Sequence, residues 1–437
     1  MTAIWNDIET LKQWFEACAP ERVPSDAEYV DFDAWPDVEA SGHVIQGLRG
    51  NAFVKRAATT IRLATNQSTQ LMTGFRGSGK TTELRKLAKT LRAEGYYVVE
   101  ADARKFDNFT RPHTIVDLTL VLAAAVGTAA ESGRLNRAGN IFQRMASFLT
   151  SSAQASSLSL EFPVVKLQFD LKNEDFREQV RGFLENQRNE LRAWFHGLVA
   201  DIREAHGNQQ VVILIDGLEK YDAADPKDAE MAYRAAASLF ENFSDWLELP
   251  DVHTVYCVPP LFSTIESALR ARYDDVHPPL SSVRIRRKPP GNEICEDGVQ
   301  SLITAMSKRV DLGKLFGDHH TECATAIALA SGGHVRDLFL LLRTVIRDTM
   351  AMQTLIGLPH ISSMIAFQHG AFGVTSAQLK ILQQVKLTGT VAVEDFGALT
   401  KVFDDYLVFA YANGEHWFAL SPLGERRLTN SRGFDQE

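Results

Sequence analysis

The stretch from Thr73 to Thr82, Thr-Gly-Phe-Arg-Gly-Ser-Gly-Lys-Thr-Thr, fits the pattern G-x-x-x-x-G-K-[ST] without a mismatch. It follows the apolar pair Leu71-Met72 and opens onto a helical pattern, which is the setting of a phosphate-binding loop. Its glycines let backbone N–H groups turn inward, its lysine supplies a charge for the outer phosphates, and the next hydroxyl suits Mg²⁺. The sequence therefore predicts a nucleotide-phosphate site made of Gly74, Arg76, Gly77, Ser78, Gly79, Lys80, Thr81 and Thr82.

Length and charge narrow the class of protein. The 437 residues are enough for two or three domains, and 46 basic against 55 acidic side chains give a net charge of −9. This balance argues against non-specific coating of nucleic acid. The four cysteines form no C-x-x-C pair, so the spacing suggests neither a disulfide frame nor a zinc site.

The N-terminus shows no signal-peptide pattern, and the longest apolar run, Leu118 to Ala130, is too short to span a bilayer. We expect this run to be a buried helix, with no membrane partner and a cytoplasmic location.

Apolar runs alternate with helical patterns through the first two thirds of the chain, which is typical of a doubly wound, mostly parallel sheet. The weak, serine-rich pattern at about 131–175 is predicted to be an insertion. Predicted helices cover 4–15, 51–64, 84–91, 117–130 and 176–202, and predicted strands cover 96–101, 211–215, 252–258 and 282–285.

Beyond Gly291 the pattern is helical only, with predicted helices over 298–310, 323–330 and 335–350. From about Ala371 it changes again to two helices and a hairpin, the order of a winged helix. Asn413-Gly414 marks the hairpin turn. We predict an α/β fold with a P-loop NTPase sheet core, an α-helical lid and a C-terminal winged-helix domain. The expected boundaries are 1–68 for an N-terminal helical segment, 69–290 for the core, 291–370 for the lid and 371–437 for the winged helix.

An acidic residue, Asp216, closes the apolar run 211–215. A phosphate-loop sheet holds Mg²⁺ at the carboxyl end of a buried strand, so we assign Asp216 as a metal ligand with Thr81. The alternative is that Asp216 caps the next turn. Gly217 stands where many P-loop ATPases have glutamate, which leaves Glu219 either as the base that activates water or as a salt-bridged surface residue.

A second phosphate contact is predicted in the run Ser331 to Asp337, where two glycines precede Arg336 in the first turn of a helix. The alternative is that Arg336 pairs with a neighbouring carboxylate. Strand 252–258 offers no clean polar sensor. An arginine finger across a subunit boundary has five candidates, which are otherwise solvated surface side chains: Arg270, Arg272, Arg284, Arg286 and Arg287.

With these pieces placed, the chain resembles AAA+ ATPases of the origin-recognition-like and STAND-like group. The resemblance rests on GFRGSGKTT, VVILIDGLEK, SGGHVRDLFLLLR and the winged helix, and it covers most of the chain. It implies ATP and Mg²⁺ as cofactors, with catalytic roles for Lys80, Asp216, Glu219 and Arg336. Asp-Gly-Leu-Glu in place of Asp-Glu is similar to STAND switches and implies slow turnover. Bacterial ATPases of this kind often belong to antiphage defence systems.

Three purposes remain open at this point. The first is a regulatory ATPase that controls a partner protein, as a homo-oligomer if a finger acts in trans. The second is a DNA-binding initiator or loader, which is not favoured because residues 371–437 carry six basic against eight acidic side chains. The third is a nucleotide-holding scaffold without turnover.

Overall fold

The computed structural model describes most of the chain. The described residues are 3–35, 37–38, 44–45, 47–50, 52–107, 112–132, 144–145, 147–149, 178, 180–182, 184–207, 209–219, 226–260, 269–288, 293–368, 373–391, 396–412 and 415–431. Most of the predicted insertion and the turn Asn413-Gly414 lie outside them.

The chain forms two compact units. The sheet unit consists of Phe53–Gly74 and Glu83–Pro278, and the lid unit consists of Met1–Ala52, Phe75–Thr82 and Pro279–Glu437. The phosphate loop is thus grouped with the C-terminal third of the chain, although it is joined covalently to a strand of the sheet.

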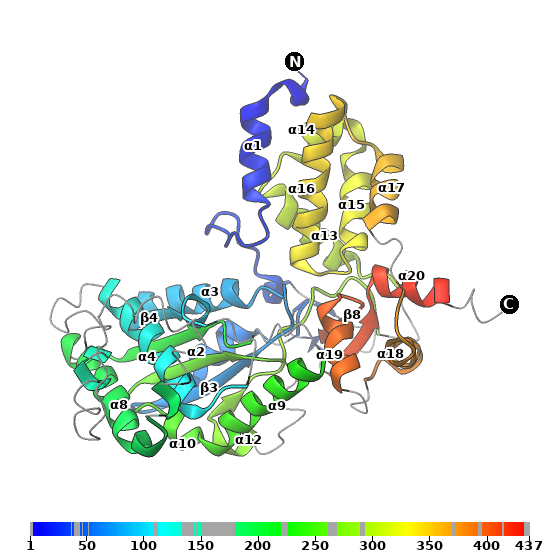
Figure 1. Cartoon of the computed structure of the whole chain (residues 1–437). Coiled ribbons are helices and arrows are strands. Elements are labelled where there is room, and N and C mark those ends of the chain that lie inside the picture. Colours follow the sequence, from blue (N-terminus) through cyan, green and yellow to red (C-terminus); the bar gives the residue numbers. More distant parts are fainter. Residues whose placement is uncertain are drawn as a thin grey trace. The chain divides into compact units, whose positions relative to one another are not determined.

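The sheet unit contains five parallel strands in the order β4-β5-β6-β3-β7 (Figure 1). Every residue of β3, β5 and β6 is buried, as expected for strands covered on both faces. The predicted α/β fold with a parallel sheet is confirmed. The strands are β3 (Ser68–Thr73), β4 (Tyr97–Asp102), β5 (Val211–Asp216), β6 (His253–Val258) and β7 (Asp275–Val276).

Seven helices are described in or entering this unit. The predicted helix 176–202 is divided, because the polar run Glu185–Gln187 forms a 3₁₀ turn before α8 begins. The described helices are α2 (Phe53–Leu63), α3 (Lys80–Ala93), α4 (Ile115–Ser132), α8 (Arg188–Ala205), α9 (Pro226–Asn242), α10 (Ser244–Leu247) and α12 (Leu269–Arg272).

The predicted strand at 282–285 is wrong. Its backbone N–H groups donate to three separate segments: Ser282 to Ala410, Val283 to Gly333 and Arg284 to Leu48, at 2.9, 3.0 and 3.0 Å. No ladder with one partner forms, and the apolar pattern reflects burial within the lid unit. The fifth strand is instead β7, which pairs with β3 through only two residues and carries too short a signal to be read from sequence.

Helices make up much of the lid unit. The N-terminal helix α1 (Ile8–Ala17) packs with them through Leu11 and Trp14, and Cys18, which follows α1, lies in the same core. Three of its helices match the predicted lid, and α14 and α17 were not predicted. The lid helices are α13 (Glu296–Ser307), α14 (Leu312–Phe316), α15 (His320–Ala330), α16 (Val335–Met352) and α17 (Leu358–Gln368).

The C-terminal elements confirm the predicted winged helix. Two helices precede an antiparallel pair in which Val408 faces Leu420 and Ala412 faces His416. A capping box of Thr375 and Gln378 fixes the first turn of α18. The elements are α18 (Ser376–Thr388), α19 (Phe396–Asp404), β8 (Val408–Ala412), β9 (His416–Leu420) and a further helix, α20 (Pro422–Ser431).

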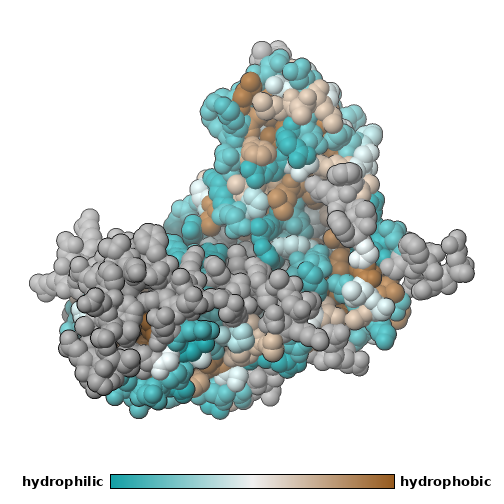
Figure 2. Space-filling view, in the orientation of Figure 1, coloured by the Kyte–Doolittle hydropathy of each residue, from teal (hydrophilic) through white to brown (hydrophobic). Residues whose placement is uncertain are grey.

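Hydrophilic atoms cover most of the described surface on the face drawn in Figure 2, with separate apolar spots over the lid helices and the winged helix. Helix α4 is apolar, but its first three turns are buried in the sheet unit, as predicted for the run Leu118 to Ala130. Among the described helices, none has the length and hydropathy to cross a membrane.

Candidate nucleotide site

The phosphate loop has the backbone that its glycines predict. Gly77 and Gly79 have φ angles of +78° and +94°, a region that side chains with a Cβ rarely adopt. The N–H of Ser78 and the ammonium of Lys80 both donate to the Phe75 carbonyl, at 3.2 and 3.0 Å. Lys80 is only 6% exposed. These residues form a tight, cationic turn of the kind that fits a phosphate group.

His334, immediately before α16, contacts the loop within the lid unit. Its Nε2 donates to the Arg76 carbonyl at 2.8 Å, and its Nδ1 lies 3.2 Å from the Asp337 carboxylate. A Cβ on Gly77 would lie 2.4 Å from the imidazole, so glycine is needed there for close approach as well as for φ. Sequence reasoning missed His334, because only its position in the fold distinguishes it from other histidines.

The winged helix also packs on the loop. The Phe75 ring stacks on Phe403 of α19 with centroids 4.3 Å apart, and it meets Phe418 of β9 edge-on at 6.3 Å. The His334 ring stacks on Phe409 of β8 at 4.9 Å. One aromatic cluster therefore joins the phosphate loop, the lid and the winged helix.

Arg49 is a second residue that sequence reasoning missed. Its side chain is 3% exposed, and its guanidinium would lie 3.5 Å from a Cβ placed on Gly79. The same group lies over the Phe32 ring, 4.8 Å from the centroid. Arg49 belongs to an irregular segment of the chain and to no sequence motif, so the sequence carries no signal for it. Its place beside the loop makes it a candidate phosphate ligand.

Arg336 occupies the predicted first turn of α16. Its guanidinium donates to Glu21 at 2.7 Å, and that carboxylate is largely exposed. An exposed ion pair of this kind contributes about 0–1 kcal/mol, so it presents a small barrier to exchange of partner. The role of Arg336 as a phosphate sensor stays a prediction.

Asp216 lies at the carboxyl edge of the sheet unit. Strand register pairs Ile215 with Tyr256 and Met72 with Cys257, so Asp216 reaches the edge beside Cys257 and close to the end of β3. The phosphate loop leaves the sheet from this same edge, the usual side for ligands in a parallel sheet.

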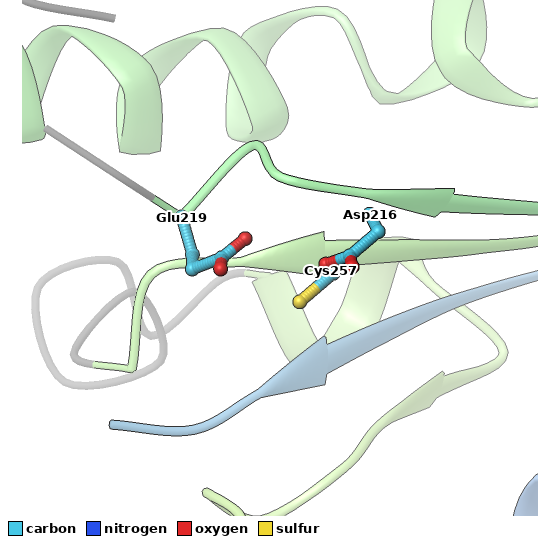
Figure 3. A group of neighbouring side chains, drawn as sticks. All are labelled: Asp216, Glu219 and Cys257. Atoms are coloured by element: carbon cyan, nitrogen blue, oxygen red, sulfur yellow. The ribbon is translucent and has the colours of Figure 1, made fainter. Parts of the chain in front are cut away.

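The chain turns after Asp216, as the proposed role of Glu219 requires. Gly217 has a φ of +91°, and a Cβ there would lie 2.6 Å from Cγ of Arg104. Beyond this turn, the Glu219 carboxylate lies near the end of the strand, and ligand atoms of Asp216, Glu219 and Cys257 lie within 4.8 Å of one another (Figure 3). Oxygen ligands of this kind fit Mg²⁺.

Arg104 balances part of the negative charge at this edge. It donates to both oxygens of Asp102, at 2.7 and 2.8 Å, and lies 3.6 Å from Asp216. Burial acts to raise the pKa of Asp102, but the hydrogen bonds and charge of Arg104 hold that pKa below its ordinary value. The hydrogen bond that Arg104 donates to Asp102 in turn raises the pKa of Arg104, with support from the Asp216 charge.

The structure argues against one arginine-finger candidate, Arg284, and also against the alternative that it is a solvated surface side chain. Arg284 is 2% exposed and donates to the Ala412 carbonyl at 3.2 Å, so it is committed inside the lid unit. Desolvation lowers its pKa. Arg270, Arg272, Arg286 and Arg287 lie at exposed positions and stay candidates.

Comparisons with known proteins give structural similarity alone. No protein-family model matches the sequence, and no curated protein matches it. The ORC2 protein of Aeropyrum pernix in its ADP form is 10% identical with a TM-score of 0.41, over 96% of this chain and 97% of that one. Drosophila ORC bound to DNA is 12% identical with a TM-score of 0.39, over 97% of this chain and 92% of that one. The RuvB Holliday junction branch migration motor of Thermotoga maritima is 13% identical with a TM-score of 0.37, over 86% of this chain and 93% of that one.

Proposed function

We propose that this chain is an AAA+-type ATPase that works as a slow regulatory switch, in which the nucleotide at the phosphate loop sets the position of the winged helix. The observation that carries the proposal is the aromatic contact of Phe75 with Phe403. It joins the loop that would hold the phosphates directly to the C-terminal domain.

The loop supplies the binding chemistry in this proposal. Lys80 would exchange its bond to the Phe75 carbonyl for the outer phosphates, and inward N–H groups would hold the rest. Because Phe75 and Arg76 belong to the same tight turn, a change in loop backbone would be felt by Phe403 and His334. The sequence lacks guanine-specifying N-K-x-D and T-K-x-D patterns, which favours ATP.

Hydrolysis would use the carboxylates of Asp216 and Glu219 at the carboxyl edge of the sheet unit, which we call the carboxylate edge. Bound Mg²⁺, held by Thr81 and Asp216, would polarise the phosphate oxygens. Glu219 would accept a proton from the attacking water, and Arg336 would bind the terminal phosphate after release from Glu21. Glu219 is separated from Asp216 by a glycine turn, an arrangement that we expect to give slow turnover.

A protein partner is favoured over DNA. The winged helix uses several of its cations internally: Lys401 pairs with Asp405 at 3.1 Å and Lys386 with Glu425 at 2.6 Å. Residues 284–288 form another basic run, but one of its cations is not available at the surface, because Arg284 is buried. Together with the balance of six basic against eight acidic side chains in 371–437, these pairs oppose the phosphate neutralisation that duplex binding requires. A role in antiphage defence and a cytoplasmic location stay predictions.

ATP binding and turnover of the wild type, Lys80→Ala and Glu219→Gln test the proposal, with Lys89→Ala and the exposed Glu204→Gln as matched controls. We expect Lys80→Ala to lose nucleotide binding and Glu219→Gln to bind ATP but turn over about 100-fold more slowly. Wild-type binding without turnover above that of Lys80→Ala would leave only a nucleotide-holding scaffold. Tight, salt-sensitive duplex binding that is lost on deleting residues 371–437 would instead favour the DNA-loading alternative.

A further inference from the structure

Cys257 completes a mixed ligand set at the carboxylate edge of the sheet unit. Figure 3 shows its thiol, from β6, pointing toward the carboxylates of Asp216 and Glu219 from the end of β5 and the turn that follows. Their ligand atoms lie within 4.8 Å of one another. Cys257 is fully buried and Asp216 is 7% exposed, whereas Glu219 is half-buried.

The local charge favours a divalent cation. Arg104 offers one positive charge at this edge, against the carboxylates of Asp102, Asp216 and Glu219. Arg104 donates two hydrogen bonds to Asp102 and also lies 3.6 Å from Asp216, so these four side chains, three carboxylates and one guanidinium, carry a net charge of 1 − 3 = −2 next to the thiol. A bound dication would neutralise this excess.

The donor atoms distinguish between cations. Mg²⁺ prefers an octahedron of oxygen ligands, and a sulfur ligand adds nothing to its binding. Zn²⁺ is bound by sulfur at about 2.3 Å and carboxylate oxygen at about 2.0 Å in a tetrahedron, so its ligand atoms lie roughly 3.5 Å apart. A set already within 4.8 Å needs only a small closure to reach that spacing. Sulfur with two carboxylates supplies three ligands and leaves the fourth position open.

From this arrangement we infer that Asp216, Glu219 and Cys257 form a site for a thiophilic divalent cation, of which Zn²⁺ is the representative, and that its occupancy shuts the ATPase off. As the metal binds, the S–H bond of Cys257 breaks, a sulfur–metal bond forms and the proton passes to solvent, with no change of oxidation state. The inhibitory part rests on the proposed function, because it assigns Asp216 to Mg²⁺. The binding part is independent of it.

Cobalt titration of the full-length protein without nucleotide tests the binding part. A thiolate bound to Co²⁺ gives a near-ultraviolet charge-transfer band, which carboxylates and histidines do not give. We expect one equivalent to bind with this band in the wild type and in Cys295→Ser, a matched change of another buried cysteine. Cys257→Ser should lose the band and bind Zn²⁺ at least about ten-fold more weakly, as measured against a chromophoric chelator.

If Cys257→Ser fails to fold, Glu219→Gln gives a second test of the site. It retains the sulfur, so it should keep the band while its Zn²⁺ affinity falls. A band that is absent from the wild type, or that persists in folded Cys257→Ser, overturns the site. Zn²⁺ inhibition of the wild-type ATPase that is reversed by chelator and weakened in Cys257→Ser supports the regulatory part, and equal inhibition of both proteins overturns it. A wild type with the band and no ATPase activity would contradict the proposed function while leaving the metal site standing.

Discussion

The Phe75 ring of the phosphate loop stacks on the Phe403 ring of α19, with centroids 4.3 Å apart and planes inclined by 29°. Phe75 is half-buried, and Phe418 closes the cluster from β9. Stacked aromatic pairs of this kind contribute about 0.5–1.5 kcal/mol beyond the area they bury. In the proposed function, nucleotide bound at the loop would act on the winged helix through this contact.

Phe75→Ala should release the winged helix. Because the substitution removes the ring contacts with Phe403 and Phe418, amide exchange in residues 396–420 should rise and should no longer respond to ATP. Hydrogen-exchange mass spectrometry with and without ATP measures this response. Phe148→Ala is the matched control, since it removes a stacked ring from Trp194 within the sheet unit. Unchanged exchange in Phe75→Ala would contradict the proposed coupling.

Arg49→Ala should weaken nucleotide binding by about 10- to 100-fold, the range expected for loss of a charged hydrogen bond of about 1.5–3 kcal/mol. Arg49→Lys should recover only part of it, because an ammonium lacks the planar fork of donors. Titration with a fluorescent ATP analogue measures the affinities. Arg309→Ala is matched, because Arg309 also lies over a ring, Phe339, at 3.7 Å. Equal losses in both variants would indicate a stability effect.

Gly217→Ala should separate binding from turnover. At a φ of +91° the substituted residue is strained and would place its Cβ 2.6 Å from Cγ of Arg104, so either the turn that carries Glu219 or the Arg104 side chain beside Asp102 and Asp216 must move. We expect ATP affinity to be retained and turnover to fall at least about ten-fold. Gly207→Ala controls for strain, because its φ is +63° with no neighbouring atom within 4 Å. Normal turnover in Gly217→Ala would contradict a role in catalysis for the geometry of the turn at Gly217.

The segments predicted correctly from the sequence are those in which residues with functional side chains stand at fixed positions relative to an apolar strand or helix pattern. The loop at Gly74 to Thr81, the strand that ends in Asp216 and the helix that carries Arg336 each combine an apolar period with residues at fixed offsets. Local backbone rules determine such segments, because the strand, the turn and the helix start all lie within a few residues. The domain boundaries and the site roles stay predictions.

Features that depend on tertiary structure were missed or mistaken. His334, Arg49 and Cys257 gain their meaning from neighbours distant in sequence, so no spacing signals them. The run 282–285 has a strand-like pattern, yet its N–H groups bond to three different segments. Periodicity reports burial and cannot say which backbone will supply the partner.

Asp33, whose carboxyl group interacts with Arg49, gives a pH-dependent prediction. Burial raises its pKa from 3.8 to about 6, although the charge of Arg49 opposes the shift. A raised carboxyl pKa means that the folded state binds the proton more tightly than the unfolded chain, so the free energy of unfolding falls as pH rises from about 4 through 6. Above that window the buried carboxylate costs roughly 2–3 kcal/mol, since each pKa unit corresponds to about 1.4 kcal/mol. Asp33→Asn should therefore stabilise the protein by about this amount at pH 8, and the gain should shrink steadily toward pH 5. Urea unfolding across this range measures it, with the exposed Asp318→Asn as control. A gain that is independent of pH would show that Asp33 acts through packing and not through its charge.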